Sequence, residues 1–162
     1  MRFRPGLLLA VLAVGAGCSK PPAPSADPIR LVSKDDAQMN AAMATARTTV
    51  GTFITALKSP RSTQTAFSVK ARFTDGNGVE YMWLVPVTFD GKTFHGEINN
   101  TPEKVMTVKL GQAVTVEPSE IVDWMYIDNG TLVGGYTTRA LRDSMSPTER
   151  AEFDKTVPFT VK

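Results

Sequence analysis

Two carboxylates and two aromatic side chains crowd the short segment from Asp123 to Asp128. On a strand, Trp124 and Tyr126 point to one face and Asp123 points to the other. An aromatic pair beside carboxylates can floor a binding groove. The same pattern also fits two core aromatic residues and an aspartate that caps a following helix. We favour this second, structural interpretation.

The segment that follows offers an anion site and a pair of arginines. Gly134 and Gly135 precede a helix start, where backbone N–H groups can hold an anion, but the lysine and spacing of a phosphate loop are missing. A tight strand-to-helix turn is favoured. Arg139 and Arg142 share a helix face. We expect Arg139 to pair internally with Asp123 or Asp128, in preference to a partner's carboxylate. The candidate binding residues are therefore Asp123, Trp124, Tyr126, Tyr136 and Arg139.

Other catalytic, cofactor and metal chemistry finds little support. His95 is the sole histidine and Cys18 the sole cysteine, whereas a structural zinc site needs about four such ligands. His95 alternates with Phe94 and Gly96 on a predicted strand, which favours a solvent-facing, inert side chain with no acid–base partner readable nearby. The sequence predicts no catalytic set, no cofactor and no metal.

One long helix opens the domain. Apolar residues recur at steps of three and four from Met39 to Leu57, which predicts a helix over residues 34–58. Ser33 is the expected N-cap and Pro60 ends the helix. Met39 and Met43 are expected in the core.

A sheet and two short helices follow. Period-two alternation predicts a hairpin over residues 67–73 and 79–89, then strands over 92–98, 113–116, 121–127 and 131–133. Short helices are predicted over residues 136–144 and 147–155, the second opened by the capping box Ser146-Pro147-Thr148-Glu149. The fold class is α+β, with the long N-terminal helix packed on a curved antiparallel sheet or small β-barrel.

The N-terminus predicts export. Arg2 and Arg4 precede an uncharged apolar run, and small residues lead directly to Cys18. The apolar run is far shorter than the ~20 residues of a spanning helix. Residues 1–17 are predicted to be a lipoprotein signal peptide, because this ending resembles the bacterial lipobox, with Gly15 where a leucine is usual. Lipidation of Cys18 would anchor the chain stably. A plain secretory signal is the alternative.

Residues 18–32 form the lipidated cysteine and a proline-rich linker, and residues 33–162 a single globular domain. Ser19 follows the cysteine, and by resemblance to other lipoproteins this favours the outer membrane, facing the periplasm. Removal of the signal takes Arg2 and Arg4 and leaves 16 basic and 16 acidic residues. No charge pattern points to nucleic acid.

A family resemblance extends from about residue 36 to residue 154. The chain resembles the bacterial YegJ-like proteins, which carry domain of unknown function 2314. Its most specific segments are Ile121-Val122-Asp123-Trp124-Met125 and Gly134-Gly135-Tyr136-Thr137-Thr138-Arg139. The resemblance implies a compact α+β domain and no particular activity.

These observations predict a non-enzymatic, membrane-anchored lipoprotein that faces the periplasm and binds a protein. A sharper form of the hypothesis is an immunity-type inhibitor of a secreted effector, by analogy of address and size. The alternatives are a hydrolase acting on cell-wall or envelope material, built on Asp123, Asp128, Tyr126 and Arg139, and a structural envelope protein.

Overall fold

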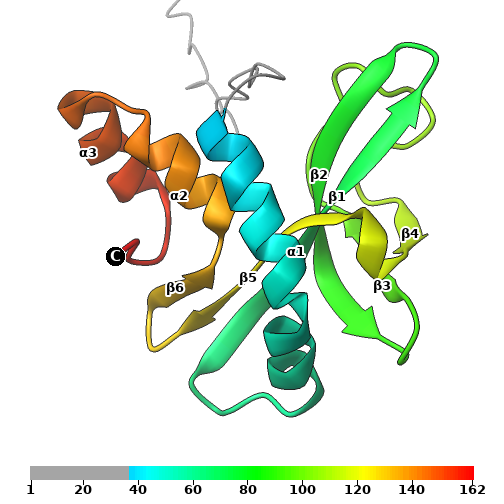
Figure 1. Ribbon diagram of the computed structural model, residues 1–162, viewed down its shortest axis with the longest axis horizontal. Helices are drawn as coiled ribbons and strands as arrows, with labels where there is room; N and C mark the ends of the chain where they lie inside the picture. The colour runs from blue at the N-terminus through cyan, green and yellow to red at the C-terminus, as the bar shows by residue number, and fades with distance from the viewer. Residues whose placement is uncertain (1–36) are drawn as a thin grey trace, which may run out of the picture.

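The computed structural model describes residues 37–162, so the predicted signal peptide, Cys18, the linker and the expected cap Ser33 lie outside the described residues. The described chain runs from one helix through six strands to two short helices (Figure 1). The bounds are α1 Ala37–Lys58, β1 Gln64–Asp75, β2 Gly78–Phe89, β3 Phe94–Ile98, β4 Ala113–Val116, η1 Pro118–Glu120, β5 Ile121–Asp128, β6 Thr131–Gly134, α2 Tyr136–Asp143 and α3 Pro147–Thr156.

Helix α1 follows the predicted stripe and ends where predicted. It buries Met39, Ala46 and Phe53, whereas Met43 is half-buried. The chain leaves the helix just before Pro60, which cannot donate a helical hydrogen bond. The Phe53 ring lies 5.6 Å from Trp124 and 6.0 Å from Phe94, centroid to centroid. These rings hold α1 against the sheet, each burial being worth about 1.5–3 kcal/mol.

The six strands form one antiparallel sheet in the order β4-β3-β2-β1-β5-β6. The two ends of this order do not pair, so the predicted α+β fold is confirmed with an open sheet and not a closed barrel. Figure 1 shows α1 crossing the sheet, with α2 and α3 grouped toward the β6 end and β3 and β4 at the opposite end.

The burial phase of β2 was not readable from its alternation, because Met82 and Leu84 in one set are as apolar as Val79 and Trp83 in the other. The structure buries Met82 and Leu84 completely and leaves Tyr81 43% exposed. A register shift between Leu84 and Val87 then reverses the phase, so that Val87 also faces the core. Such a bulge places one extra residue on the bent strand.

The C-terminal part matches its prediction closely. Ser146 and Glu149 form both hydrogen bonds of the capping box that starts α3. After α3, Thr160 returns to β6, where its N–H donates to the Gly130 carbonyl and its carbonyl accepts from the Leu132 N–H. The returning chain therefore covers the outer edge of β6. Over residues 37–162, none of the helices combines the length and apolarity that crossing a bilayer requires.

Candidate functional site

Trp124 and Tyr126 belong to the core beneath α1. They are 2% and 6% exposed. The Trp124 indole donates to the Ala46 carbonyl at 3.0 Å, and the Tyr126 ring stacks on Phe67 at 4.9 Å. The expected core packing of both residues is confirmed, although Tyr126 also borders a shallow depression shared with Thr55.

Asp123 caps α2 from a fully buried position. Its carboxylate accepts hydrogen bonds from the Thr137 N–H at 2.8 Å, the Thr137 hydroxyl at 2.6 Å, the Tyr136 N–H at 3.1 Å and its neighbour Trp124 N–H at 2.8 Å. Burial raises the pKa of Asp123 above its ordinary value, while the bonds from Thr137 and Trp124 and the charge of Lys70 act in the opposite direction. The predicted capping role is confirmed.

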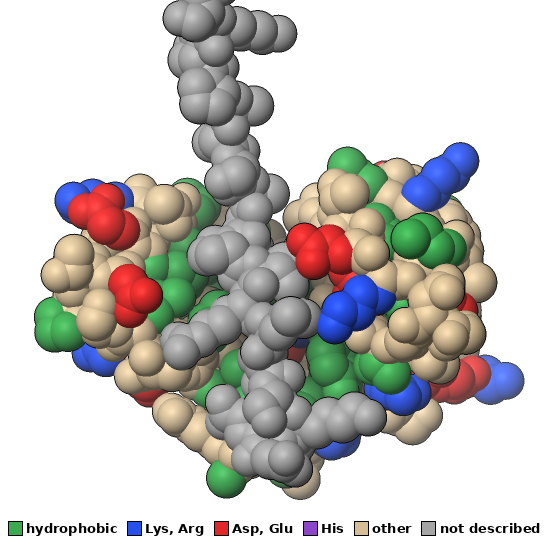
Figure 2. Space-filling model, turned by 90° about the horizontal axis from the view of Figure 1, so that it is seen from above, with side chains coloured by type: hydrophobic (Ala, Val, Ile, Leu, Met, Phe, Trp, Pro, Cys, Tyr) green, Lys and Arg blue, Asp and Glu red, His purple; other side chains and the backbone are tan. Residues whose placement is uncertain are grey.

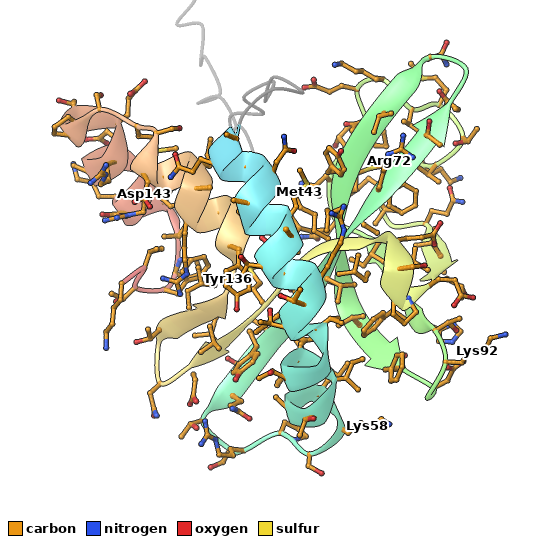
Figure 3. The ribbon with its side chains drawn as sticks, viewed as in Figure 1. Met43, Lys58, Arg72, Lys92, Tyr136 and Asp143 are labelled. Atoms are coloured by element: carbon orange, nitrogen blue, oxygen red, sulfur yellow. The ribbon has the colours of Figure 1, made fainter. Side chains whose placement is uncertain are left out.

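Tyr136 and Arg139 tie the same corner together. The Tyr136 hydroxyl accepts a bond from Thr49 of α1 at 3.2 Å, and Figure 3 shows Tyr136 beside that helix. Arg139 donates to the carbonyls of Gly134 at 2.9 Å and Leu132 at 2.6 Å, and to that of Lys162. Internal pairing of Arg139 was expected, but the predicted carboxylate partner is wrong: the guanidinium fork satisfies backbone carbonyls at the end of β6.

The other carboxylate of β5 is engaged separately. Asp128 pairs with Arg61 and accepts from the Thr63 hydroxyl at 2.7 Å. The hydrogen bond from Thr63 and the charge of Arg61 lower the pKa of Asp128. Asp123 and Asp128 thus serve different elements and do not converge on one cleft. A binding role for Asp123, Trp124, Tyr126, Tyr136 and Arg139 stays a prediction.

The glycine pair forms the tight turn that was favoured over an anion site. Gly134 and Gly135 have φ angles of 71° and 61°. A Cβ on Gly134 would lie 2.3 Å from the Trp124 carbonyl oxygen, and one on Gly135 would lie 2.7 Å from a Leu132 methyl group. Only glycine combines this left-handed backbone with so close an approach.

His95 has the polar partners that the sequence prediction failed to identify. Its Nε2 lies 2.8 Å from Asp90 Oδ2 and 3.1 Å from Thr93 Oγ1, and its Nδ1 lies 3.0 Å from Thr115 Oγ1. The predicted exposure is confirmed, since 45% of the side chain is accessible, but the prediction of no nearby partner is wrong. Asp90 and Thr93 were readable as close neighbours across the turn, whereas Thr115 required the β3–β4 register.

The turn before β3 fixes the Asp90 carboxylate. Asp90 Oδ1 accepts from the N–H groups of Lys92 and Thr93, both at 2.7 Å. The contact with His95, followed by these backbone bonds, holds the pKa of Asp90 far below its ordinary value. When a carboxylate contacts one nitrogen of an imidazole and a hydroxyl group contacts the other, the carboxylate can orient the histidine as a general base.

A shallow groove of about 390 Å³ lies over this end of the sheet, on the face turned away from the core. Its lining includes Pro86 and Thr88 of β2, His95 and Glu97 of β3, and Ala113 and Thr115 of β4. Figure 3 places Lys92 at the same end of the molecule. No group of three or more metal-binding side chains occurs within residues 37–162.

An open six-stranded sheet with one long N-terminal helix and two short C-terminal helices defines the class of this domain. The bacterial family described as an uncharacterized protein conserved in bacteria, domain of unknown function 2314, matches residues 36–160. The chain belongs to this family, as its resemblance to the YegJ-like proteins indicated.

Two relatives each match a little under half of the chain. A putative ankyrin repeat protein of Neisseria meningitidis serogroup B is 40% identical over 80 residues, which cover 49% of this chain and 32% of the relative. The uncharacterized protein YegJ of Escherichia coli K12 is 41% identical over 71 residues, covering 44% and 46%. The matches thus span less than half the length of either relative. No solved structure matches.

Proposed function

We propose that this chain is a non-enzymatic protein-binding module, carried by a lipoprotein that Cys18 anchors in the bacterial envelope, facing the periplasm. The main support is the uncovered edge of β4. The chain's own C-terminal segment covers the edge of β6, whereas β4 has β3 as its sheet neighbour on one side and no described strand on the other. An exposed strand edge is a ready template for another polypeptide.

The surroundings of β4 also favour a protein partner. Leu110, on the loop leading into β4, is 55% exposed, and Met106 of the same loop is 73% exposed. Exposed apolar side chains beside a free strand edge give a partner both apolar area and backbone hydrogen bonds. On both sides of the grey atoms in Figure 2, acidic and basic side chains lie dispersed among the other residues.

Site-specific photo-cross-linking in the intact envelope tests this proposal. A cross-linking amino acid at Leu110 of the full chain is expected to capture one discrete protein, and the same residue at Glu152 on α3 is the control. The captured protein must then bind the purified chain at a defined stoichiometry. A wall hydrolase that loses activity on binding would support the immunity-type form. Capture at neither position, or equal capture at both, would overturn the binding proposal and leave a structural envelope protein.

A hydrolase acting on envelope material is the second candidate, because His95 lies between Asp90 and the Thr115 hydroxyl. In that case His95 would accept the proton of Thr115 or of a bound water as that oxygen bonds to the substrate, and would return the proton to the leaving group as the scissile bond breaks. The test is release of soluble fragments from purified cell wall by the intact protein. His95→Ala would abolish the release, and His95→Gln, which retains hydrogen bonding but not proton transfer near neutral pH, would abolish it as well.

A further inference from the structure

We infer that β4 accepts an extended, basic segment of a partner polypeptide as a seventh strand of the sheet, which rests on the protein-binding function proposed above. The backbone pattern at the start of β4 determines which groups are free. Gly111 N–H donates to the Ile98 carbonyl at 2.8 Å, and Ile98 N–H donates to the Gln112 carbonyl at 3.0 Å. With φ of 76° at Gly111, this is a G1 bulge.

After the bulge, the backbone N–H and C=O groups of every second residue of β4 point away from β3. Val114 and Val116 lie opposite Gly96 and Phe94 and continue the hydrogen-bonded positions of the ladder. The N–H and C=O groups of Ala113 and Thr115 therefore point away from β3. Both residues are exposed, and both have short side chains that leave the edge accessible.

The side chains beside this edge favour a basic strand. Glu97 lies opposite Ala113, is exposed, and makes no side-chain hydrogen bond or ion pair with residues 37–162. Glu117 and Glu120 follow β4 and are exposed, and Lys104 and Lys109 are the basic residues on the loop before it. The charged side chains beside and after β4 are therefore the carboxylates of Glu97, Glu117 and Glu120, whereas both lysines lie on the loop before the strand.

Geometry allows Glu97 to reach the added strand. Neighbouring strands are ~4.8 Å apart, so an added residue beside Ala113 would have its backbone ~9.6 Å from that of Glu97. The Ala113 methyl group does not fill this gap. A lysine or arginine on the partner can extend over it and pair with Glu97, whereas an acidic residue would be repelled.

A second copy of the chain fits less well. Only Ala113 and Thr115 present outward backbone groups, so pairing of two β4 strands would be limited to these positions. The surface buried by pairing at two positions falls far below the ~1,200 Å² typical of stable interfaces. A separate partner strand can continue beyond β4 to contact Leu110, which is exposed.

Synthetic strands provide a direct test on the full chain. The probes are a capped nine-residue peptide alternating valine with lysine, the same peptide with glutamate for lysine, and the lysine peptide N-methylated along one backbone edge. We expect the lysine peptide to bind at least ~10-fold more tightly than either control and to shift the NMR amide signals of Ala113 and Thr115.

Two variants separate backbone pairing from charge. Thr115→Pro removes one outward N–H where an edge strand tolerates proline, and it should weaken binding by at least ~10-fold. Its control, Thr115→Val, keeps the N–H and should bind within ~2-fold of wild type. Glu97→Lys should reverse the preference between lysine and glutamate peptides. Thermal unfolding of each variant confirms that the fold persists.

Three outcomes would overturn this mode of binding: Thr115→Pro binding as well as wild type, shifts confined to another surface, or concentration-dependent self-association through Ala113 and Thr115. If the envelope partner is captured at Leu110 while amide hydrogen exchange at Ala113 and Thr115 is unchanged on binding, the strand-addition mechanism fails and the protein-binding function stands. If no partner is captured and no peptide binds, both fail.

Discussion

Removal of the Asp123 carboxylate should destabilise the fold more than loss of any single exposed charge. The carboxylate accepts four hydrogen bonds at 2.6–3.1 Å from three residues and is fully buried. Asp123→Ala leaves three buried or half-buried N–H groups and a hydroxyl without this acceptor. The lost cap is worth ~1 kcal/mol and each buried, unsatisfied donor 1–3 kcal/mol, partly offset because a buried charge is also removed. We expect the free energy of unfolding to fall by about 3 kcal/mol.

Urea denaturation followed by circular dichroism measures this loss, with Asp143→Ala as the control. Asp143 is an exposed carboxylate at the other end of the same helix, and its removal should change stability by less than ~0.5 kcal/mol. A loss below ~1 kcal/mol for Asp123→Ala would show that α2 docks without this cap, and the reasoning would be refuted.

The pH dependence of Asp123→Asn gives a second measure of the same site. Burial raises the pKa of Asp123 above its ordinary 3.8, so the folded protein binds this proton more readily than the unfolded chain does. The stability that this proton contributes is fully present below pH 3.8 and is lost as the pH rises through the folded-state pKa of Asp123. The free energy of unfolding of wild type should therefore rise relative to that of Asp123→Asn as the pH falls from neutral toward 3.8. If wild type instead loses stability relative to Asp123→Asn over this range, the four hydrogen bonds outweigh burial and keep the carboxylate ionised.

The remaining predictions concern the turns and charges around β5. Gly134→Ala should cost about 3 kcal/mol, since its Cβ would meet the Trp124 carbonyl at 2.3 Å, whereas Gly51→Ala, with open space on α1, should stabilise by about 0.5–1 kcal/mol; chemical denaturation measures both. Arg139→Lys should cost about 2 kcal/mol by the same assay, because an ammonium group cannot satisfy the carbonyls that the guanidinium fork binds together, and a neutral result would contradict this. The pKa of Asp128 is lowered, so the stability that its carboxylate contributes is present above pH 3.8 and is lost as the pH falls through the folded-state pKa. Asp128→Asn should therefore make the free energy of unfolding fall less steeply at acid pH. An unchanged fall would show that Asp128 does not contribute to the acid dependence of stability.

Local signals predicted most of the secondary structure because each is enforced by nearby residues. Pro60 ends α1, and the Ser146–Glu149 box starts α3. The Asp75 to Gly78 turn and the Asn129-Gly130 turn set two hairpins. The phase of β2 could not be read, because Tyr81 and Met82 are both apolar, and a bulge near Val87 decides which set is buried.

The candidate site depended on contacts between distant residues. The capping role of Asp123 could be anticipated, since its helix starts shortly after its strand. The acceptors of Arg139 are backbone carbonyls, which carry no sequence signal, so a carboxylate was predicted instead. Among the partners of His95, Thr115 joins it only through the β3–β4 register and could not be read from the sequence, whereas Asp90 and Thr93 lie close along the chain and were overlooked.

The residues that carry the family resemblance most clearly have structural roles in the fold. Trp124 packs under α1, Asp123 caps α2, Gly134 makes the turn and Arg139 holds its end. Substituting any of them is expected to lower stability, so a change in binding by such a variant would not by itself locate a binding surface.

The outer face at β3 and β4 has the opposite character. Glu97, Ala113 and Thr115 are exposed, and the main-chain bonds that hold β4 to β3 do not depend on their side chains. Exposed substitutions of this kind usually change stability by less than ~0.5 kcal/mol. A change in binding caused by Glu97→Lys with unchanged unfolding would therefore report on recognition and not on folding.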